Sequence, residues 1–286
     1  MKMRSNKKRW KTKAAANLMA ETGAASVEDA VVRLVESVRE SARAEGFRDG
    51  LAGPPYDPWP LAAVLGASKV GRRALGFDGR VVREGDGLVV EIDNGTISRQ
   101  RGRFTFAHEV GHLALWKVGG KVVKTASRRN SRQSEIEELC NTIASEVLAP
   151  RSDVLKQVAG PTTENDLLNG LNTPPQTQAG PQTLLDSIAR VSRVFDVSLQ
   201  FAARRINEVC KARVAVALIA ANEERYIWRV GIPLSEELLR AVLNAVRPRD
   251  QGGSGDYWAS SPRADQLRSF AWRRLKRDLI LVTLQR

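Results

Sequence analysis

The sequence predicts an α+β protein, and three observations lead to that fold class. Two short strand-like runs, RVVRE at 80–84 and LVVEI at 88–92, are separated only by the glycine-rich turn Gly85-Asp86-Gly87. Two longer segments, at 104–116 and 135–148, have apolar residues at helical spacing. The last part, 213–286, mixes strand-like runs with one helical segment. Segregated strands and helices of this kind are typical of α+β folds.

The N-terminal part is predicted to be a basic arm followed by one helix. Residues 1–13 carry seven Lys or Arg and no acid. A helix is expected over 27–44, because Ser26 can cap its start and apolar residues recur at helical spacing. The Gly- and Pro-rich stretch beyond it indicates a linker, with a boundary near Pro54 and a short helix over 61–65.

The two central helices have predicted ends. The helix at 104–116 is apolar on nearly every side, so it should be buried, and Gly119-Gly120 should end it. The second helix should run from 135 to 148, with Ser134 as its cap and Pro150 as its stop.

The remainder is predicted to begin with a mobile loop over 160–182, which is rich in Gly, Pro, Thr, Asn and Gln. Two helices should follow, at 184–195 and 198–210, and they resemble a helix-turn-helix with Ala189 packed inside and Ser198 as the cap of the second helix. Asp196 stands where such turns often have Gly. The pair serves either DNA reading or packing and partner contact.

The terminal part should contain strands at 214–219, 225–230 and 279–284, together with a helix begun by Ser235 and a loop at 252–256.

Composition limits the cellular setting. A chain of 286 residues can bury a sizeable core without crosslinks, and its two cysteines indicate a reducing compartment, with the cytoplasm as the default. The N-terminus is too polar for a secretory signal, and no apolar run approaches the roughly 20 residues of a membrane helix. We therefore expect a soluble protein with no membrane partner.

The net charge of +13 is distributed unevenly. Nine basic residues and one acid lie between Arg99 and Arg132, and a third basic cluster at 268–277 includes Phe270 and Trp272. Such patches favour nucleic acid or another polyanion, although a solvated surface is the plain alternative. The candidate nucleic-acid contacts are Arg99, Arg101, Arg103, Lys121, Lys124, Arg128, Arg129 and Arg132.

The pattern H-E-x-x-H in FTFAHEVGHLALW predicts a metal site. His108 and His112 project from the same face of a helix, so both imidazoles can bind one ion, and they are the only histidines in the chain. Glu109 lies beside them, where it can serve as general base toward a water molecule that zinc has acidified to a pKa of about 7. A pair of ordinary core histidines is the alternative.

A catalytic zinc usually takes three protein ligands, and no third histidine exists. In the helix SEIEELCNTIASEVLAP, spacing puts Glu137 on one face with Cys140 and Asn141, so Glu137 is the predicted third ligand. Glu138 is the second choice. A capping box with Ser134 would explain Glu137 without a metal.

Together, RFTFAHEVGHLAL and IEELCNTIASEVLAP resemble the ImmA/IrrE family of bacterial metallo-endopeptidases. The resemblance covers roughly residues 55 to 210. It implies a minimal zincin-like domain with one zinc ion held by His108, His112 and Glu137, a gluzincin-like set, and with Glu109 as general base. It also implies cleavage of a helix-turn-helix repressor, which relieves repression of a stress, defence or mobile-element operon.

This interpretation divides the chain into five parts. They are a basic arm and helix at 1–53, a zincin-like peptidase domain at 54–159, a flexible loop at 160–182, a helix-turn-helix-like pair at 183–211 and a C-terminal α+β domain, GAF-like in some relatives, at 212–286.

Two hypotheses refine the site. Substrate is expected to bind as an extended strand beside Leu88, Val89, Val90, Glu91 and Ile92, so that Val90→Pro should abolish cleavage. The Cys140 thiolate could occupy the open zinc position and inhibit the enzyme, unless Cys140 is simply a small buried residue. Single-stranded DNA or another polyanion is a candidate activator. A DNA-binding regulator with a structural or vestigial zinc site is the alternative function.

Overall fold

The structure is a computed structural model that describes residues 10, 12–95, 98–119, 131–159 and 181–210, together with five C-terminal strands. The chain forms two compact units, Met1–Arg151 and Ser152–Arg286, and each is described by itself. Their described parts mix helices and strands, which confirms the α+β fold class.

The first unit begins with three helices. Helix α1 (Lys13–Thr22), which the sequence analysis does not predict, starts where the Thr12 hydroxyl accepts a hydrogen bond from the Ala15 amide. Helix α2 (Val27–Ala44) has the predicted bounds, and the predicted cap is confirmed, because Ser26 Oγ accepts from the Asp29 amide at 3.1 Å. Helix α3 (Trp59–Val64) begins two residues earlier than predicted.

A three-stranded sheet follows, made of β1 (Ala67–Arg73), β2 (Gly79–Glu84) and β3 (Gly87–Asp93). The predicted hairpin is confirmed, since β2 and β3 are antiparallel neighbours. Strand β1 is not predicted, because ASKVGRR lacks the apolar alternation of a typical strand. It pairs with β3 in parallel, so the order is β1-β3-β2 and β3 is the central strand.

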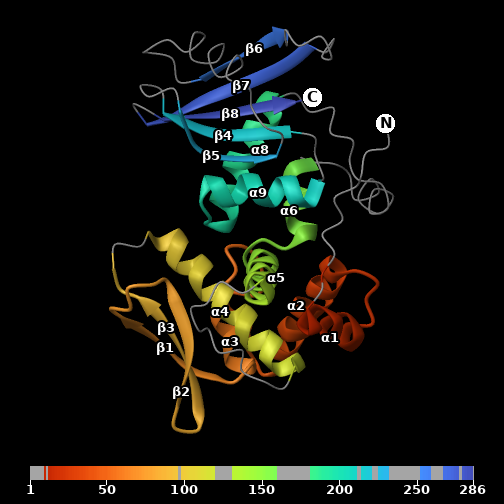
Figure 1. The fold of residues 1–286 in the computed structure, drawn as a ribbon, viewed down its shortest axis with the longest axis vertical. Coiled ribbons are helices and arrows are strands. Elements are labelled where there is room, and N and C mark those ends of the chain that lie inside the picture. The colour runs from red at the N-terminus through yellow and green to blue at the C-terminus, as the bar shows by residue number, and fades with distance from the viewer. Residues whose placement is uncertain are drawn as a thin grey trace. The chain divides into compact units, whose positions relative to one another are not determined.

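Two long helices pack against each other beside this sheet. Helix α4 (Arg99–Gly119) contacts β2, β3 and α5 (Ser131–Leu148), and Figure 1 shows these helices between the sheet and the α1–α2 pair. Helix α6 (Arg151–Ala159) follows α5 in the sequence and, apart from Arg151, belongs to the second unit. Because α5 begins at Ser131, Ser134 lies within the helix, and the prediction that Ser134 caps it is wrong.

The boundary predicted near Pro54 does not separate compact units. Arg39 of α2 is buried and donates from Nη2 to the carbonyls of Glu146 and Val147 in α5, at 3.4 and 3.0 Å. The same guanidinium lies 4.6 Å from the centre of the Tyr56 ring. These contacts satisfy carbonyls at the end of α5 that have no partner within the helix. The N-terminal helices therefore belong to the same core as α4 and α5.

The second unit contains the predicted helical pair. Helices α8 (Pro181–Phe195) and α9 (Leu199–Cys210) contact each other, and Ser198 caps α9 by accepting from the Phe201 amide at 3.1 Å. Asp196 adopts a positive φ of 50°, the conformation for which glycine is favoured at such a turn. Ala189 is only partly buried, in contrast to the predicted interior position. The loop predicted at 160–182 lies outside the described residues up to residue 180.

The described C-terminal strands form one antiparallel sheet of order β5-β4-β8-β7-β6. Their bounds are β4 Val214–Ala220, β5 Arg225–Gly231, β6 Gly252–Trp258, β7 Leu267–Lys276 and β8 Leu279–Gln285. The three predicted strands are confirmed. The predicted loop at 252–256 is instead part of β6, and the basic cluster with Phe270 and Trp272 lies mostly in β7. The helix predicted from Ser235 lies outside the described residues, and nothing supports a GAF-like identity.

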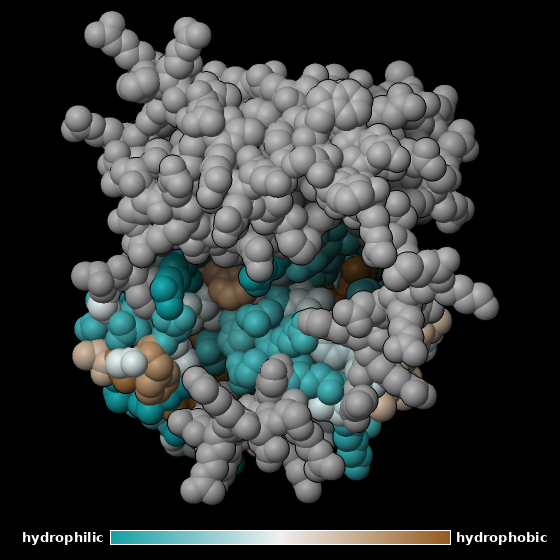
Figure 2. Space-filling model, turned by 45° about the horizontal axis from the view of Figure 1, so that its top comes forward, coloured by the Kyte–Doolittle hydropathy of each residue, from teal (hydrophilic) through white to brown (hydrophobic). Residues whose placement is uncertain are grey.

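The described surface is mostly hydrophilic on the face that Figure 2 shows, with apolar groups in smaller patches. Among the described residues, no helix is both long and apolar enough to span a bilayer.

Candidate metal centre

The predicted ligands lie together where α4 faces α5. The distance from His108 Nε2 to Glu137 Oε2 is 3.1 Å, and from His112 Nε2 to Glu137 Oε1 it is 3.8 Å. The two imidazole rings are 4.9 Å apart between centroids and nearly perpendicular. One carboxylate thus lies within reach of both Nε2 atoms, as the shared helix faces predict.

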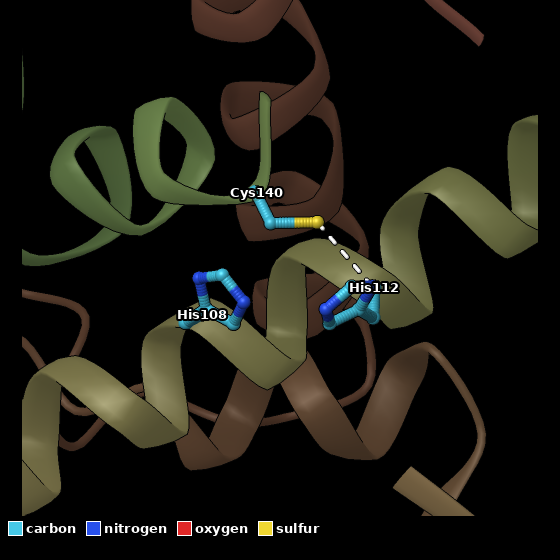
Figure 3. A group of neighbouring side chains, drawn as sticks. All are labelled: His108, His112 and Cys140. Atoms are coloured by element: carbon cyan, nitrogen blue, oxygen red, sulfur yellow. Dashed lines mark hydrogen bonds between the residues drawn. The ribbon is translucent and has the colours of Figure 1, made fainter. Parts of the chain in front are cut away.

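The other nitrogen of each ring contacts a second residue of α5. His108 Nδ1 lies 2.9 Å from Asn141 Oδ1, and His112 Nδ1 lies 3.4 Å from Cys140 Sγ. Figure 3 shows the latter contact, with both histidines projecting from α4 and the cysteine reaching toward His112 from α5. When Nδ1 carries the proton and donates it to such a partner, Nε2 is left with a free lone pair for a metal.

The donor set fits a zinc ion. Zinc bonds to imidazole nitrogen and carboxylate oxygen are about 2.0–2.2 Å long, so tetrahedral ligand atoms lie about 3.3–3.6 Å apart. The separations between the Nε2 atoms and the Glu137 oxygens span that value. His108, His112 and Cys140 also offer donor atoms within 4.8 Å of one another, a second set in which sulfur would bind.

We favour the set with Glu137, because its carboxylate approaches the Nε2 atoms while each Nδ1 already has a partner on α5. Cys140 then supports His112 from its Nδ1 side. Inhibition by a Cys140 thiolate at the zinc stays a prediction. Burial raises the pKa of the Cys140 thiol well above its usual value, which favours the neutral thiol over the thiolate that inhibition needs.

Glu109 is the buried acid of the site. It is 3% exposed, and its Oε2 has no hydrogen-bond partner among the described residues. Burial raises the pKa of Glu109 to about 7, with His108 lowering it and Glu137 raising it. A carboxyl group that exchanges a proton near neutral pH suits a general base.

The pKa values of the two histidines are shifted in opposite directions. Burial and, to a lesser extent, the neighbouring His108 together lower the pKa of His112 to about 4, so His112 is neutral at physiological pH. Burial also lowers the pKa of His108, but the bond to Glu137 and the charge of Glu109 outweigh it and raise the value overall. The same bond to His108 lowers the pKa of Glu137, which keeps that carboxylate ionised.

Gly111 allows α4 and α5 to approach at the site. A Cβ atom at Gly111 would lie 3.0 Å from Cys140 Cα and 3.1 Å from the Cys140 carbonyl oxygen. Both are backbone atoms, which cannot move away alone. Glycine between the two histidines therefore sets the spacing at which α5 can present Glu137 and Asn141.

Gly79 plays a corresponding part where β2 meets α4. A Cβ atom there would lie 2.7 Å from Thr105 Cγ2, 3.1 Å from the Glu91 carbonyl oxygen and 3.4 Å from Glu109 Oε1. The start of β2 thus borders the Glu109 carboxylate.

We expect Gly79→Ala to lower the free energy of unfolding by about 1–3 kcal/mol, the usual cost of overpacking. Thr105→Ser removes the methyl group that causes the closest contact, so the Gly79→Ala/Thr105→Ser variant should recover part of that loss. Urea denaturation of the four proteins measures both effects. Strictly additive changes would show that Gly79 and Thr105 are not in contact.

The candidate nucleic-acid residues have different surroundings. Arg101 forms a two-bonded ion pair with Asp78, at 2.8 and 2.9 Å, and Arg103 donates to the Tyr56 carbonyl at 2.8 Å. Arg103 therefore has a structural role that the sequence analysis does not anticipate. Arg99 is exposed at the start of α4. Lys121, Lys124, Arg128 and Arg129 lie outside the described residues, as does the side chain of Arg132.

The predicted substrate strand is corrected by the sheet order. Strand β3 is paired on both sides, by β1 and by β2, so it offers no free edge to a substrate. Val90 is fully buried and Glu91 is held by Arg73 and Arg80 at 3.0 and 2.7 Å. Val90→Pro would therefore break the sheet itself. The prediction is wrong because β1, which the sequence does not reveal, covers one side of β3.

The structure adds three residues to the site that received no role from sequence. The sequence analysis places Asn141 on the same helix face as Glu137 and Cys140 but gives it no role. An amide side chain on that face was the available signal that Asn141 contacts one of the histidines. Gly79 and Gly111 matter because they lack a side chain, which allows a neighbouring element to approach closely. Of the two, only Gly111 lies within the H-E-x-x-H motif, so only Gly111 could be connected with the site from the sequence.

Comparison with known proteins gives a family match for part of the chain. Residues 89–207 match the family model of the IrrE N-terminal-like domain. A search of curated proteins finds no match. Among solved structures, a Mycobacterium tuberculosis transcriptional regulator is similar at 12% identity and a TM-score of 0.48, over 95% of this chain and 79% of that chain. Residues 89–207 are thus an IrrE N-terminal-like domain of the ImmA/IrrE metallopeptidase family.

Proposed function

We propose that this protein is a zinc-dependent endopeptidase that cuts a helix-turn-helix transcriptional repressor at a specific site and so relieves repression of a stress, defence or mobile-element operon. The observation that carries the proposal is the convergence of two imidazole nitrogens on the Glu137 carboxylate, with Glu109 buried beside His108. The repressor as substrate rests on the resemblance of the H-E-x-x-H and IEELCNTIASEVLAP motifs to ImmA/IrrE peptidases.

In this proposal His108, His112 and Glu137 hold one zinc ion, with Asn141 and Cys140 orienting the two rings. When bound, zinc supplies a Lewis acid that activates water and polarises the scissile carbonyl. Glu109 accepts the proton of the attacking water and passes it to the departing amine as the C–N bond breaks. Its burial and its pKa of about 7 suit both transfers.

The open edge of β2 is the better place for the substrate strand. No described strand pairs on the outer side of β2, and its first residue, Gly79, borders Glu109. The Asp93 amide donates to the Asp78 carbonyl at 2.9 Å, so by antiparallel alternation the backbone groups of Gly79 and Val81 point away from β3. An extended peptide could pair with them and lie past the general base.

Val81→Pro should therefore lower kcat/KM by about 10-fold, the effect of one lost backbone hydrogen bond of about 1.4 kcal/mol. The β2–β3 pairing should survive, because the Val81 amide does not face β3. Val81→Thr keeps the amide and a branched side chain, and it should cleave normally. Equal activity of the proline and threonine variants, each with full zinc content, would place the substrate elsewhere.

A DNA-binding regulator with a structural zinc site is the second candidate. The α8–α9 pair favours it, since Ser198 caps the second helix and Asp196 adopts the left-handed conformation between them. A structural zinc site, however, has no need of a buried acid with an unpaired oxygen such as Glu109. We therefore place the peptidase first, with single-stranded DNA or another polyanion as a candidate activator at the basic residues of 99–132.

The test is direct incubation with a repressor. A small helix-turn-helix protein encoded beside this gene is the first substrate to try, with zinc or with a chelator, and with or without single-stranded DNA. Zinc-dependent appearance of two defined fragments supports the proposal. An intact repressor under all conditions, together with sequence-specific DNA binding by the chain itself, would favour the regulator.

A further inference from the structure

The sheet has a second free edge, on the side away from β2. Strand β1 pairs only with β3 among the described strands, and its residues from Ser68 to Val70 are exposed. Val70 is 38% exposed, one of two large apolar side chains so exposed in the described part of the chain. An uncovered strand edge that carries apolar surface is the usual template for pairing with another polypeptide.

An open pocket of about 450 Å³ lies beside this edge. Its lining consists of Trp59, Ser68, Lys69, Val70 and Phe106. Two aromatic side chains and a valine give it largely apolar walls, and its volume can hold a large side chain. Phe106 lines this pocket, whereas Thr105 and Glu109 of the same helix border Gly79 in β2. The pocket is therefore separate from the metal centre.

The charge beside the pocket indicates the partner. Arg72 lies two residues beyond Val70 in β1, so both side chains project from the same face of the strand. Arg72 is exposed and forms no ion pair with any described residue, whereas Lys69 and Arg73 are paired with Glu84 and Glu91. A carboxylate two positions from an apolar side chain would complement this arrangement.

We propose that the β1 edge is a docking site for an extended segment of a partner polypeptide that carries a large apolar residue and, two positions away, Asp or Glu. The segment pairs its backbone with β1, inserts the apolar side chain between Trp59 and Phe106, and presents its carboxylate to Arg72. The alternation of side chains along a strand puts both groups on one face. This interaction needs neither zinc nor cleavage, so it is independent of the proposed peptidase activity.

Fluorescein-labelled hexapeptides test the docking site by fluorescence anisotropy with the full-length protein. The set carries Phe, Leu or Ser at one position and Asp, Glu or Lys two positions along, and N-methylated versions of the best binder report on backbone pairing. Peptides with an apolar and an acidic residue should bind at sub-millimolar concentration. Replacing the apolar residue with Ser, or methylating the paired amides, should weaken binding at least about 10-fold, a difference of about 1.4 kcal/mol.

Two variants of the protein test the same contacts from the other side. Arg72→Glu changes an exposed side chain, so it should not disturb the core. It should reverse the preference, so that Lys-containing peptides bind better than Asp-containing ones. Val70→Asp should weaken binding of all apolar peptides. Absence of binding throughout the set, or affinities that neither variant alters, would overturn the proposal. A concentration-dependent dimer abolished by Val70→Asp would also overturn it, since a second copy would then occupy the edge.

Discussion

Glu137→Ala should release the metal and abolish cleavage. The Glu137 carboxylate lies near both histidine Nε2 atoms, at 3.1 and 3.8 Å, and no other acid in the described part of the chain is paired with either ring. Loss of a direct ligand should lower zinc affinity by more than about 100-fold, which is the upper end of the loss expected from removing a supporting group. Zinc per chain, measured by elemental analysis after dialysis, should fall toward zero while the helical circular dichroism is retained.

Glu138→Ala is the matched control for this measurement. Glu138 is the neighbouring acid on the same helix, and its backbone carbonyl accepts a bond from Thr142 that the substitution leaves in place. The variant should keep its zinc and its activity. Zinc loss in Glu138→Ala with normal zinc in Glu137→Ala would refute the assigned ligand set. Zinc loss in Cys140→Ala alone would favour the alternative set that contains sulfur.

Glu109→Gln should lower kcat by about 10²- to 10⁴-fold, the usual contribution of a positioned general base. Glutamine keeps the size of the side chain but cannot accept the proton of the attacking water. Zinc content and KM should stay close to those of the unmodified protein, because Glu109 is not one of the three proposed metal ligands. The assay is single-turnover cleavage of the repressor, followed by mass spectrometry of the fragments.

The same variant separates the two candidate functions. A regulator with a structural zinc site would bind its DNA equally well with Glu109→Gln, and no proteolytic rate would change. Cleavage by Glu109→Gln at the unmodified rate would remove Glu109 from the mechanism, even if zinc proved essential.

Much of the site could be predicted because helical spacing determines which side chains share a face. His108 and His112 are four residues apart, and Glu137, Cys140 and Asn141 follow the same rule on the next helix. The structure brings these residues together as expected. Spacing could not reveal which ring nitrogen meets which partner, because that depends on how closely α4 and α5 approach. Gly111 permits this approach by leaving out a side chain.

The errors concern contacts between segments that are distant in sequence. Most residues of β1 are exposed and three are basic, so its sequence shows no apolar alternation from which a strand could be predicted. Because β1 was missed, β3 was expected to have a free edge for the substrate, which it does not have. The linker near Pro54 has the composition of a domain boundary. Composition cannot show that Arg39, which precedes this linker in the sequence, donates a hydrogen bond to the Val147 carbonyl at the end of α5.

Arg39 makes α5, the helix that carries the proposed ligand Glu137, dependent on the N-terminal helix α2. Its guanidinium binds carbonyls in the last turn of α5, nine and ten residues after Glu137, and it is itself held by Glu36 and by the ring of Tyr56. A shortened protein that starts at Pro54 would leave those carbonyls bare and the buried surface of α5 exposed to water. Any shortened form of this chain that keeps α5 intact therefore has to include α2.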